Sequence, residues 1–570
     1  MKRFISLILA VIIASAMLTG AGAAAAGIPG DTNGDGEIDN KDVVVLFRYV
    51  SGNKSGAVEE NCDYNGDGET DNKDVVALFR AVSEGLPSII TGEFIITPDE
   101  SATLSVPRVF GDHMVLQRDS VIKVWGVSNK NGAGIRGTFM GDVVRGIVRN
   151  GKWEIKFSPK AATKDPQSLK IEDTCGNTVE FTDILVGDVW FIGGQSNAVR
   201  TMSQIGATPK ASKTMPVRVF QQDESDVWNN RTASANPCDD VINPKRCWRV
   251  SNRASATVFS AIGWYVCSRL AEETDIPQGA VCIAAGGASI CEFMPKETAD
   301  KFSYKKGIYV NAAEHYNGLI NPFVGMSFKA MVFFQGEAEG GTNSVPSSMN
   351  YARDFEALMT ELRSRWGFDF PIYNVQISDY PGEECETYWT HVGDVRAQQY
   401  DAYKKMSGVR LIPSYDIGSK TTDPDGAHSP YKKELSDRIS SLALADLYGV
   451  GKADDALAPE PDKITVVSST AQEKVIDIKF KYAGDGLVSL SGSDTVSGFM
   501  SGKSVHPYLN EKNTVSGKII SKDTVRVTVP ANCLYIGYAS AYRTMKDDVP
   551  VMQLYNSNGL PALAFYLELK

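Results

Sequence analysis

The sequence predicts a mixed α/β protein whose largest part is a doubly wound parallel sheet. Three observations lead to this fold class. Apolar strand candidates alternate with helical patterns between residues 184 and 450, as in parallel sheets covered by helices. Short β-type runs separated by turn residues occupy residues 104–183 and 451–570, which indicates an N-terminal and a C-terminal β domain. A repeated unit, expected to be all-α, precedes them between residues 28 and 86.

Length and composition agree with several folded units. The chain has 570 residues, 43% hydrophobic and 22% charged, with a formal net charge of −11. At about 150 residues per domain, this length suggests three or four units. The composition excludes a disordered chain, and the acidic balance excludes a basic nucleic-acid-binding protein. Residues 28–86 hold 13 acidic and 5 basic residues, so most of the acidic surplus lies in the repeated unit.

The chain begins with a pattern that is typical of a secretory signal peptide. Two basic residues follow Met1, an apolar run extends from Phe4 to Leu18, and small residues end at Ala26. A membrane-spanning helix needs about 20 apolar residues, and neither this run nor any later stretch reaches that length. Residues 1–26 are therefore predicted to be a signal peptide. The rest of the chain is expected to be secreted, with no membrane span.

The nine cysteines are spread thinly along the chain, without a CxxC pair or another metal-ligand spacing. An odd number leaves at least one cysteine unpaired within the chain. A bridge between Cys238 and Cys247 and free buried thiols both fit this pattern. A disulfide-dense scaffold is excluded.

The repeated unit has the pattern of a calcium-binding loop followed by a helix. The segments DTNGDGEIDNKDVVVLFRYV and DYNGDGETDNKDVVALFRAV begin at Asp31 and Asp63, and sixteen of their twenty positions are identical. Each copy places oxygen donors at loop positions 1, 3, 5, 7, 9 and 12, with glycine at position 6, an arrangement that suits Ca²⁺. The predicted ligands for two Ca²⁺ ions are Asp31, Asn33, Asp35, Glu37 (backbone carbonyl), Asp39, Asp42, Asp63, Asn65, Asp67, Glu69 (backbone carbonyl), Asp71 and Asp74.

Because Pro29 and Gly30 precede the first loop, no helix is expected before it, and each copy is half of an EF-hand. Residues 28–86 thus resemble the dockerin domain of cellulosomal enzymes. The resemblance implies docking to a cohesin module of a scaffold protein. It places the choice of cohesin at the pairs Asn40–Lys41 and Asn72–Lys73. Since the two copies agree there, two binding orientations are expected. The helices are predicted to bury Leu46, Phe47, Leu78 and Phe79.

The remaining boundaries follow from changes of pattern. Residues 87–103 are predicted to be a linker, residues 104–183 a β-sandwich, residues 184–450 the α/β domain and residues 451–570 a C-terminal β domain. Strand candidates in the α/β domain are Ile184–Ile192, Ala280–Ala285, Ala330–Phe334, Ile372–Ile377 and Leu411–Ile417. In open α/β sheets the site lies at the carboxyl ends of the strands, so the residues after these strands are the candidates for chemistry.

Ser196 follows the first of these strands, in the sequence GGQSN. A serine at a strand-to-helix turn can be presented as a nucleophile, although the sequence is not the G-x-S-x-G elbow of α/β-hydrolases. A serine nucleophile needs a base. His428 lies after the last strand, with Asp425 three residues before it to orient the ring. The other histidines are His113 and His506 in the β domains, and His315 and His391, which are expected to be structural.

Two further strand ends carry groups that can stabilise an oxyanion. Gly286 and Gly287 follow one strand, where the absence of side chains lets backbone N–H groups approach a ligand. Gln335 follows the next and offers a side-chain amide. Neither feature is specific by itself, and their joint position at successive strand ends is the informative observation.

Residues 106–569 resemble the sialate O-acetylesterase family of SGNH-type esterases. The matching motifs are VFGDHMVLQRD, GDVWFIGGQSN, FSAIGWYVCSRL, GGASICEFMP, HYNGLINPF, VFFQGEAE, DGAHSPYKKEL and LYNSNGLPALAF. The resemblance implies an SGNH-type sheet with Ser196 as nucleophile and His428 as base. It also implies an oxyanion hole made of the Ser196 amide, the Gly286–Gly287 turn and Gln335. The chain departs from the family's DIHP motif, having Gly426 two residues before the histidine, so Asp425 is assigned on the broader SGNH spacing.

These features together predict a secreted carbohydrate esterase that removes O-acetyl groups through an acyl-enzyme and needs no catalytic cofactor. The dockerin favours plant cell-wall substrates such as acetylated xylan or pectin, whereas the family name favours O-acetyl sialate on host glycans. The alternative from a different functional class is a non-catalytic carbohydrate-binding protein, in which the esterase fold has lost its activity. A metalloenzyme is disfavoured because the chain has no HExxH motif and no clustered histidines.

Overall fold

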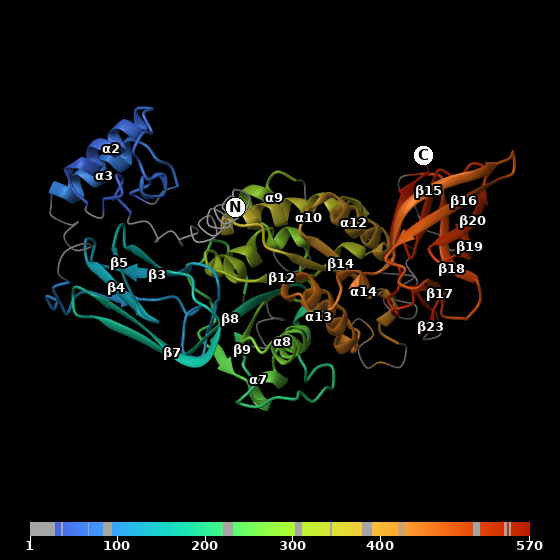
Figure 1. The fold of residues 1–570 in the computed structure, drawn as a ribbon, viewed down its shortest axis with the longest axis horizontal. Helices are drawn as coiled ribbons and strands as arrows, with labels where there is room; N and C mark the ends of the chain where they lie inside the picture. The colour runs from blue at the N-terminus through green and yellow to red at the C-terminus, as the bar shows by residue number, and fades with distance from the viewer. Residues whose placement is uncertain are drawn as a thin grey trace, which may run out of the picture. The chain divides into compact units, whose positions relative to one another are not determined.

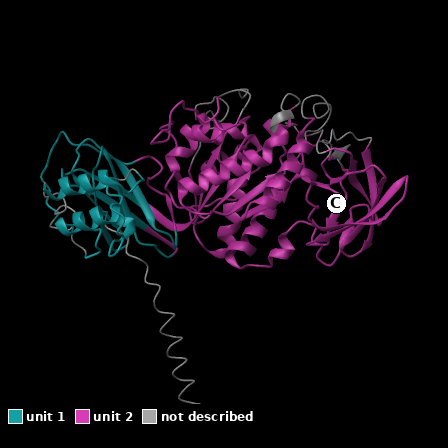
Figure 2. Ribbon diagram, turned by 90° about the horizontal axis from the view of Figure 1, so that it is seen from above, with its two compact units in different colours: residues 1–106, 118–161, 167–182 teal, residues 107–117, 162–166, 183–570 magenta. Residues whose placement is uncertain are grey.

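The computed structural model describes most of the chain. The described residues are 29–35, 38–65, 68–83, 94–220, 232–302, 311–341, 345–378, 390–420, 423, 426, 428–504, 513–540, 544–546 and 549–569. The predicted signal peptide and the residues Glu37, Asp67 and Asp425 lie outside this set. The chain forms two compact units, one comprising residues up to Val106 with Arg118–Ala161 and Gln167–Thr182, and one comprising the remainder (Figure 2).

The repeated unit folds as two helices, α2 (Asn40–Val50) and α3 (Asn72–Ser83), with the short helix η1 (Glu59–Asn61) between them. Asp39 caps α2 by accepting from the Lys41 amide at 2.6 Å, an arrangement that satisfies an orphan N–H of the first turn. Leu46 and Leu78 are fully buried, as the sequence predicts. Phe47 and Phe79 are not buried, which corrects the prediction, because they lie on the outer side of the helices with 56% and 54% of their surface exposed.

The N-terminal β region consists of short antiparallel strands. One sheet contains β1 (Leu104–Ser105), β3 (Ile122–Ser128) and β6 (Lys152–Phe157), and β4 (Gly134–Phe139) pairs with β5 (Asp142–Ile147) and β7 (Thr163–Asp173). In β6, Trp153, Ile155 and Phe157 are buried and the residues between them are exposed. This alternation is expected for strands with one face on a core.

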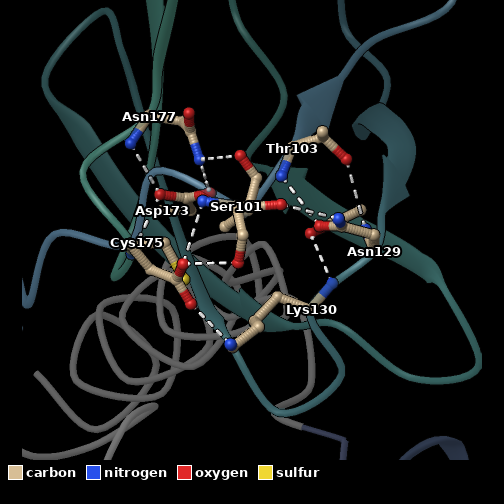
Figure 3. A network of polar contacts seen from close by, with 10 residues as sticks. Ser101, Thr103, Asn129, Lys130, Asp173, Cys175 and Asn177 are labelled. Carbon is tan, nitrogen blue, oxygen red and sulfur yellow. Dashed lines mark hydrogen bonds and ion pairs between the residues drawn. The ribbon is translucent and has the colours of Figure 1, made fainter.

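The segment before β1 belongs to this β region. The Thr97 amide donates to the Thr174 carbonyl at 2.8 Å and the Asp99 amide to the Cys175 carbonyl at 2.9 Å. Polar side chains around Ser101, Asn129 and Asp173 continue this connection (Figure 3). Residues 97–103, which the sequence places in a linker, are therefore hydrogen-bonded to the strands beside them.

The central sheet has the strand order β10 (Trp248–Val250), β9 (Val217–Phe220), β11 (Gln278–Ala284), β8 (Thr178–Gly194), β12 (Ala330–Phe334), β13 (Ile372–Gln376) and β14 (Val409–Pro413). The short β2 (Val115–Gln117) pairs with β8. From β9 to β14 all neighbours are parallel, and β10 is antiparallel to β9. The five predicted strands are present as β8, β11, β12, β13 and β14. The last ends at Pro413, and η6 (Tyr415–Ile417) follows it as a helical turn.

Helices cover both faces of this sheet (Figure 1). On one side α8 (Ala261–Thr274) packs against α13 (Lys432–Tyr448), and on the other α10 (Val345–Trp366) packs against α12 (Val392–Lys405). The shorter elements are α5 (Ser196–Val199), α7 (Arg253–Thr257), α9 (Lys296–Ala299), α14 (Ala453–Ala456), η2 (Ile290–Phe293), η3 (Tyr316–Ile320), η4 (Asn321–Phe323) and η5 (Glu337–Gly340). Every helix in the described part is too short or too polar to cross a bilayer.

The C-terminal region is β-structured, in the order β15 (Glu460–Ser469), β16 (Glu473–Lys481), β20 (Thr524–Pro530), β19 (Thr514–Ser521), β18 (Thr495–Gly502), β21 (Tyr535–Tyr538) and β25 (Phe565–Glu568). Two small pairs accompany it: β17 (Leu487–Ser489) with β24 (Leu554–Asn556), and β22 (Met545–Lys546) with β23 (Val549–Pro550). Its core includes Tyr400 and Tyr415 from the α/β part. Gln376 at the end of β13 also donates to the Ala564 carbonyl at 2.8 Å, so this region and the parallel sheet share one compact unit.

Candidate active site

Three of the predicted site segments meet at one edge of the central sheet. The last residue of β8, Gly194, is in register with Ala284 of β11 on one side and Phe334 of β12 on the other. Ser196, Gly286 and Gln335 each follow one of these strands. β8 is also the point at which the chain order along the sheet reverses, where a ligand crevice forms in open α/β sheets.

Ser196 is the first residue of α5 and has 5% of its surface exposed. The turn that presents it depends on Gly194, whose φ is +126°. A Cβ atom there would lie 2.0 Å from the Phe334 carbonyl oxygen. The same backbone is held by a 3.0 Å bond from the Gln195 amide to that oxygen and a 3.0 Å bond from the Ala285 amide to the Gly194 carbonyl. At the start of a helix the Ser196 amide needs no intrahelical acceptor, so it is available to a ligand oxygen.

His428 is connected to α5 through Arg200, which caps the end of that helix. The Arg200 guanidinium donates from Nη2 to His428 Nδ1 at 2.8 Å. Burial, followed by the charges of Arg200 and Lys432, lowers the pKa of His428 from 6.5 to about 3, so the ring is neutral at pH 7. With Nδ1 accepting, the neutral ring carries its hydrogen on Nε2. A base that takes the serine proton at Nε2 needs the other tautomer, with Nδ1–H facing an acceptor.

Gly286 and Gly287 lie in a tight turn after β11. The Ala288 amide donates to the Ala285 carbonyl at 3.4 Å, which closes a tight turn. Gly287 has a φ of +71°, a conformation that glycine adopts without strain. Gly286 is buried and Gly287 half-buried, and η2 begins directly after the turn.

Gln335 lies fully buried behind this turn. Its amide nitrogen, Nε2, donates to Glu339 Oε2 at 2.5 Å, and it also lies 3.2 Å from the Ala288 carbonyl and 3.3 Å from Gln195 Oε1. An amide nitrogen has two hydrogens, so both are engaged in this arrangement. To reach an oxyanion, the Gln335 amide must first release one of these acceptors.

A buried chain of three polar side chains, which the sequence patterns did not indicate, lies beside the nucleophile turn. Lys432 Nζ donates to Asn197 Oδ1 at 2.6 Å, and Asn197 Nδ2 donates to Glu337 Oε1 at 2.7 Å. Burial raises the pKa of Glu337 to about 7 and lowers that of Lys432 to about 7. Burial likewise raises the pKa of Glu339 to about 7. The feature of the sequence that could have revealed this group is the pair of carboxylates, Glu337 and Glu339, that follows the all-apolar strand β12.

The other described histidines each face a carboxylate. His113 Nδ1 lies 2.7 Å from Asp183, and His391 Nδ1 lies 2.8 Å from Asp394. His315 Nε2 lies 3.4 Å from Glu292 Oε2, with both side chains buried. These contacts agree with the structural role expected for His315 and His391. His506 is outside the described residues.

The two predicted calcium loops have equivalent hydrogen bonds. The carboxylate of Asp42 accepts from the Asn33 and Asp39 amides at 3.0 and 2.8 Å, and that of Asp74 accepts from the Asn65 and Asp71 amides at 2.9 and 2.8 Å. Both carboxylates are fully buried, and their oxygen chemistry suits a hard cation. Within the described residues no three His, Cys, Asp or Glu side chains are gathered closely enough for a metal ion. The loop residues Gly36, Glu37, Gly66 and Asp67 lie outside that set.

All eight cysteines in the described part of the chain are free thiols. The bridge between Cys238 and Cys247 is therefore not formed in this structure. Cys238 and Cys247 are half-buried, whereas Cys267, Cys282 and Cys291 are buried within the α/β part.

Comparisons with known proteins identify two families that match parts of this chain. The profile of the family described as carbohydrate esterase, sialic acid-specific acetylesterase matches residues 186–435, and that of the dockerin type I domain matches residues 29–83. The sialate O-acetylesterase of Mus musculus is 24% identical over 433 residues, covering 63% of this chain and 76% of that protein. The same enzyme of Pongo abelii is 24% identical over 436 residues, covering 67% and 79%.

Among solved structures, a carbohydrate acetylesterase from Xanthomonas citri has a TM-score of 0.65 at 22% identity, covering 82% of this chain and all of that one. This likeness supports the α/β fold. Type I dockerin domains generally bind calcium and dock to cohesins. Both sequence resemblances are confirmed: residues 186–435 form a domain of the sialic acid-specific carbohydrate acetylesterase family, which makes the protein a carboxylic ester hydrolase, and residues 29–83 form a type I dockerin domain.

Proposed function

We propose that the protein is a secreted, cellulosome-associated SGNH-type esterase that removes O-acetyl groups from plant cell-wall polysaccharides such as acetylated xylan or pectin. The observation that carries this proposal is the meeting of the Ser196 turn, the Gly286–Gly287 turn and the Gln335 loop at the ends of three adjacent strands. The dockerin favours the plant cell wall. The family description and the mammalian relatives favour O-acetyl sialate as the second substrate class.

The proposed reaction follows the serine esterase sequence. Ser196 Oγ attacks the acetyl carbonyl carbon while its proton passes to His428 Nε2. The ester C–O bond then breaks, and that proton moves to the leaving sugar oxygen. Water attacks the acetyl-serine and gives a proton to His428. The acyl C–Oγ bond breaks, acetate leaves, and the proton returns to Ser196 Oγ.

Two other groups complete the proposed site. Asp425 is proposed to accept from His428 Nδ1–H, which requires Arg200 to leave that nitrogen. The developing oxyanion is proposed to bind the Ser196 amide, the Gly286–Gly287 turn and the Gln335 amide, whose 3.3 Å contact with Gln195 is the longest of its three. Donors held in place before the reaction stabilise such a charge best, and the Gln335 amide meets this condition once it has released Gln195.

The direct experiment measures acetate release from acetylated xylan, acetylated pectin and O-acetyl sialoglycans side by side. Wild-type activity on the two plant polysaccharides and its loss in Ser196→Ala are expected. Activity on the sialoglycans alone would overturn the substrate choice. Equal release by wild type and Ser196→Ala would overturn the serine mechanism, and release no faster than the spontaneous rate from every substrate would favour the non-catalytic alternative.

For the dockerin, we propose two Ca²⁺ ions and a cohesin-binding surface on the outer side of α2 and α3. The pairs Asn40–Lys41 and Asn72–Lys73 begin the two helices. Next to them lies an apolar groove of about 480 Å³, lined by Val43, Val44, Phe47, Arg48, Val75, Val76 and Phe79. Each copy contributes a valine pair and a phenylalanine, so the surface is repeated along with the sequence. This supports the proposal of two binding orientations.

The orientations are tested by replacing the Asn–Lys pair with alanines in the first copy, in the second copy and in both. If either orientation serves, each single-copy variant keeps cohesin affinity within a few-fold of wild type, and the variant altered in both copies loses it. Loss of binding in one single-copy variant alone would show that only one copy faces the partner.

A further inference from the structure

The buried chain Lys432–Asn197–Glu337 joins the two segments that carry the predicted nucleophile and base. Asn197 directly follows Ser196 in α5, Glu337 begins η5 after β12, and Lys432 begins α13, four residues after His428. Their exposed fractions are 3%, 1% and 2%. Residues 235 positions apart in the chain are thereby joined by one 2.6 Å hydrogen bond.

The two neighbours of Asn197 allow its side-chain amide only one orientation. Its carbonyl oxygen faces an ammonium group and its amide nitrogen faces a carboxylate; a flipped amide would place donor against donor and acceptor against acceptor. The second Glu337 oxygen, Oε2, has no hydrogen-bond partner within the described structure. Glu337 is therefore held through Asn197, and Asn197 is held from both sides.

When Lys432 and Glu337 are both ionised, their opposite charges balance each other in this buried site. A buried charge is destabilising unless it is paired, and the removal of one partner leaves the other uncompensated. Lys432 Nζ also lies 5.2 Å from the centre of the Phe334 ring, which adds a favourable cation–π contact. Among the described residues, the charges that act on His428 include Arg200, at 2.8 Å from Nδ1, and Lys432 at the start of the following helix.

We propose that Glu337, Asn197 and Lys432 are positioning residues for the esterase reaction, which lock the Ser196 turn to the segment that bears His428. The proposal rests on the proposed function, because it takes these two residues as nucleophile and base. Lys432 has a second effect, since its positive charge disfavours a second proton on His428 and so keeps the base ready to accept one. Glu337 lies at the other end of the hydrogen-bonded series, joined to Lys432 through Asn197.

The test compares Lys432→Met, Glu337→Gln, the double variant and Lys432→Arg with wild type in the full chain. The probe is hydrolysis of 4-nitrophenyl acetate between pH 3 and 9, with thermal unfolding measured in parallel. Lys433→Met is the matched control, because Lys433 lies on the same helix with 63% of its side chain exposed and pairs with Asp437. The control should leave kcat, KM and the pH profile unchanged.

We expect Lys432→Met and Glu337→Gln each to lower kcat about 10- to 100-fold, the size expected when catalytic groups are displaced by about 1 Å. KM should change less than about threefold. Lys432→Met should also move the acidic limb of kcat/KM to higher pH, whereas Lys432→Arg should keep that limb in place. The double variant should unfold at a higher temperature than either single variant, because no charge is left unpaired.

A folded Lys432→Met variant with wild-type kcat and an unmoved acidic limb would overturn the proposal. If that variant fails to fold, the double variant gives the same two readouts, and Lys432→Arg serves as the reference that keeps the charge. A loss of stability with an unchanged pH profile in every variant would mean that Lys432, Asn197 and Glu337 have a purely structural role. That result would also overturn the proposal. These outcomes differ from failure of the proposed function, in which Ser196→Ala would hydrolyse the ester as fast as wild type.

Discussion

Replacement of Gly194 by alanine should destabilise the α/β unit and disturb the nucleophile turn at the same time. The alanine Cβ would lie 2.0 Å from the carbonyl oxygen and 2.5 Å from the carbonyl carbon of Phe334, which are backbone atoms of the neighbouring strand β12. A side chain at φ +126° adds strain. The strain costs about 1–2 kcal/mol and the overpacking about 1–3 kcal/mol. The expected loss of unfolding free energy is therefore about 2–5 kcal/mol.

Gly206→Ala is the matched control, because Gly206 also has a positive φ, +68°, but no heavy atom lies within 4 Å of the place that an alanine Cβ would take. It should lose only the strain, about 1–2 kcal/mol. Urea unfolding followed by tryptophan fluorescence gives both values, and ester hydrolysis by the folded fraction gives kcat/KM. Gly194→Ala should lower kcat/KM at least about tenfold, since Ser196 lies two residues away. Equal stability and activity of the two variants would refute the steric argument.

Four further outcomes are expected. In Arg200→Met, loss of the guanidinium charge should raise the pKa of His428, so the acidic limb of kcat/KM should move to higher pH; an unmoved limb would mean that this charge does not act on the ring. Burial raises the pKa of Glu292 from 4.5 to about 8. Because the folded state holds this proton more tightly than the unfolded state, wild type should lose stability as pH rises from 4.5 to 8. Glu292→Gln, which has no charge to bury, should therefore melt at a higher temperature than wild type at pH 9, but not at pH 4. Leu46 is fully buried and Phe47 is 56% exposed. Leu46→Ala should therefore lower the free energy of unfolding of the dockerin by about 2–5 kcal/mol, and Phe47→Ala by under about 1 kcal/mol. Hydrogen exchange in residues 29–83 measures both values, and equal effects would contradict the difference in burial. Chelation of calcium should speed exchange in residues 29–83 and leave hydrolysis of a soluble ester unchanged, and a parallel loss of both would contradict the separation of the two sites.

The sequence predicts the position of the site because a parallel sheet brings the carboxyl ends of its strands to one edge. Three local patterns, each a strand followed by glycine or a polar residue, were sufficient to place Ser196, Gly286 and Gln335 together. The two strands at one side of the sheet, β9 and the edge strand β10, were not predicted, because they have four and three residues and such short runs leave little periodicity to detect. The exposure of Phe47 was also missed, since helical periodicity identifies an apolar face but does not show which residue at its margin faces the partner helix.

The contacts of the site were harder to predict than its position. The contact between Arg200 and His428 joins residues 228 positions apart, and that between Asn197 and Glu337 joins residues 140 positions apart. Local spacing carries no information on such pairs, and the charge of Arg200 beside the imidazole changes which ring nitrogen bears the hydrogen. The cue that the sequence did offer was unusual chemistry in an apolar context, namely two carboxylates and a glutamine directly after the five apolar residues of β12.

The side-chain amides of Gln195 and Asn197, on either side of Ser196, hold the nucleophile turn in place together with Gly194. On one side, Gln195 Oε1 accepts from the Gly336 and Ala338 amides at 3.3 and 3.2 Å, which ties the turn to the loop after β12. On the other side, Asn197 ties it to Lys432 at the start of α13. A serine held between two buried amides has little freedom to drift from its neighbours, and preorganisation of this kind is what an oxyanion site requires. Substitution of Gln195 or Asn197 should therefore lower kcat even though neither side chain takes part in the proposed bond changes.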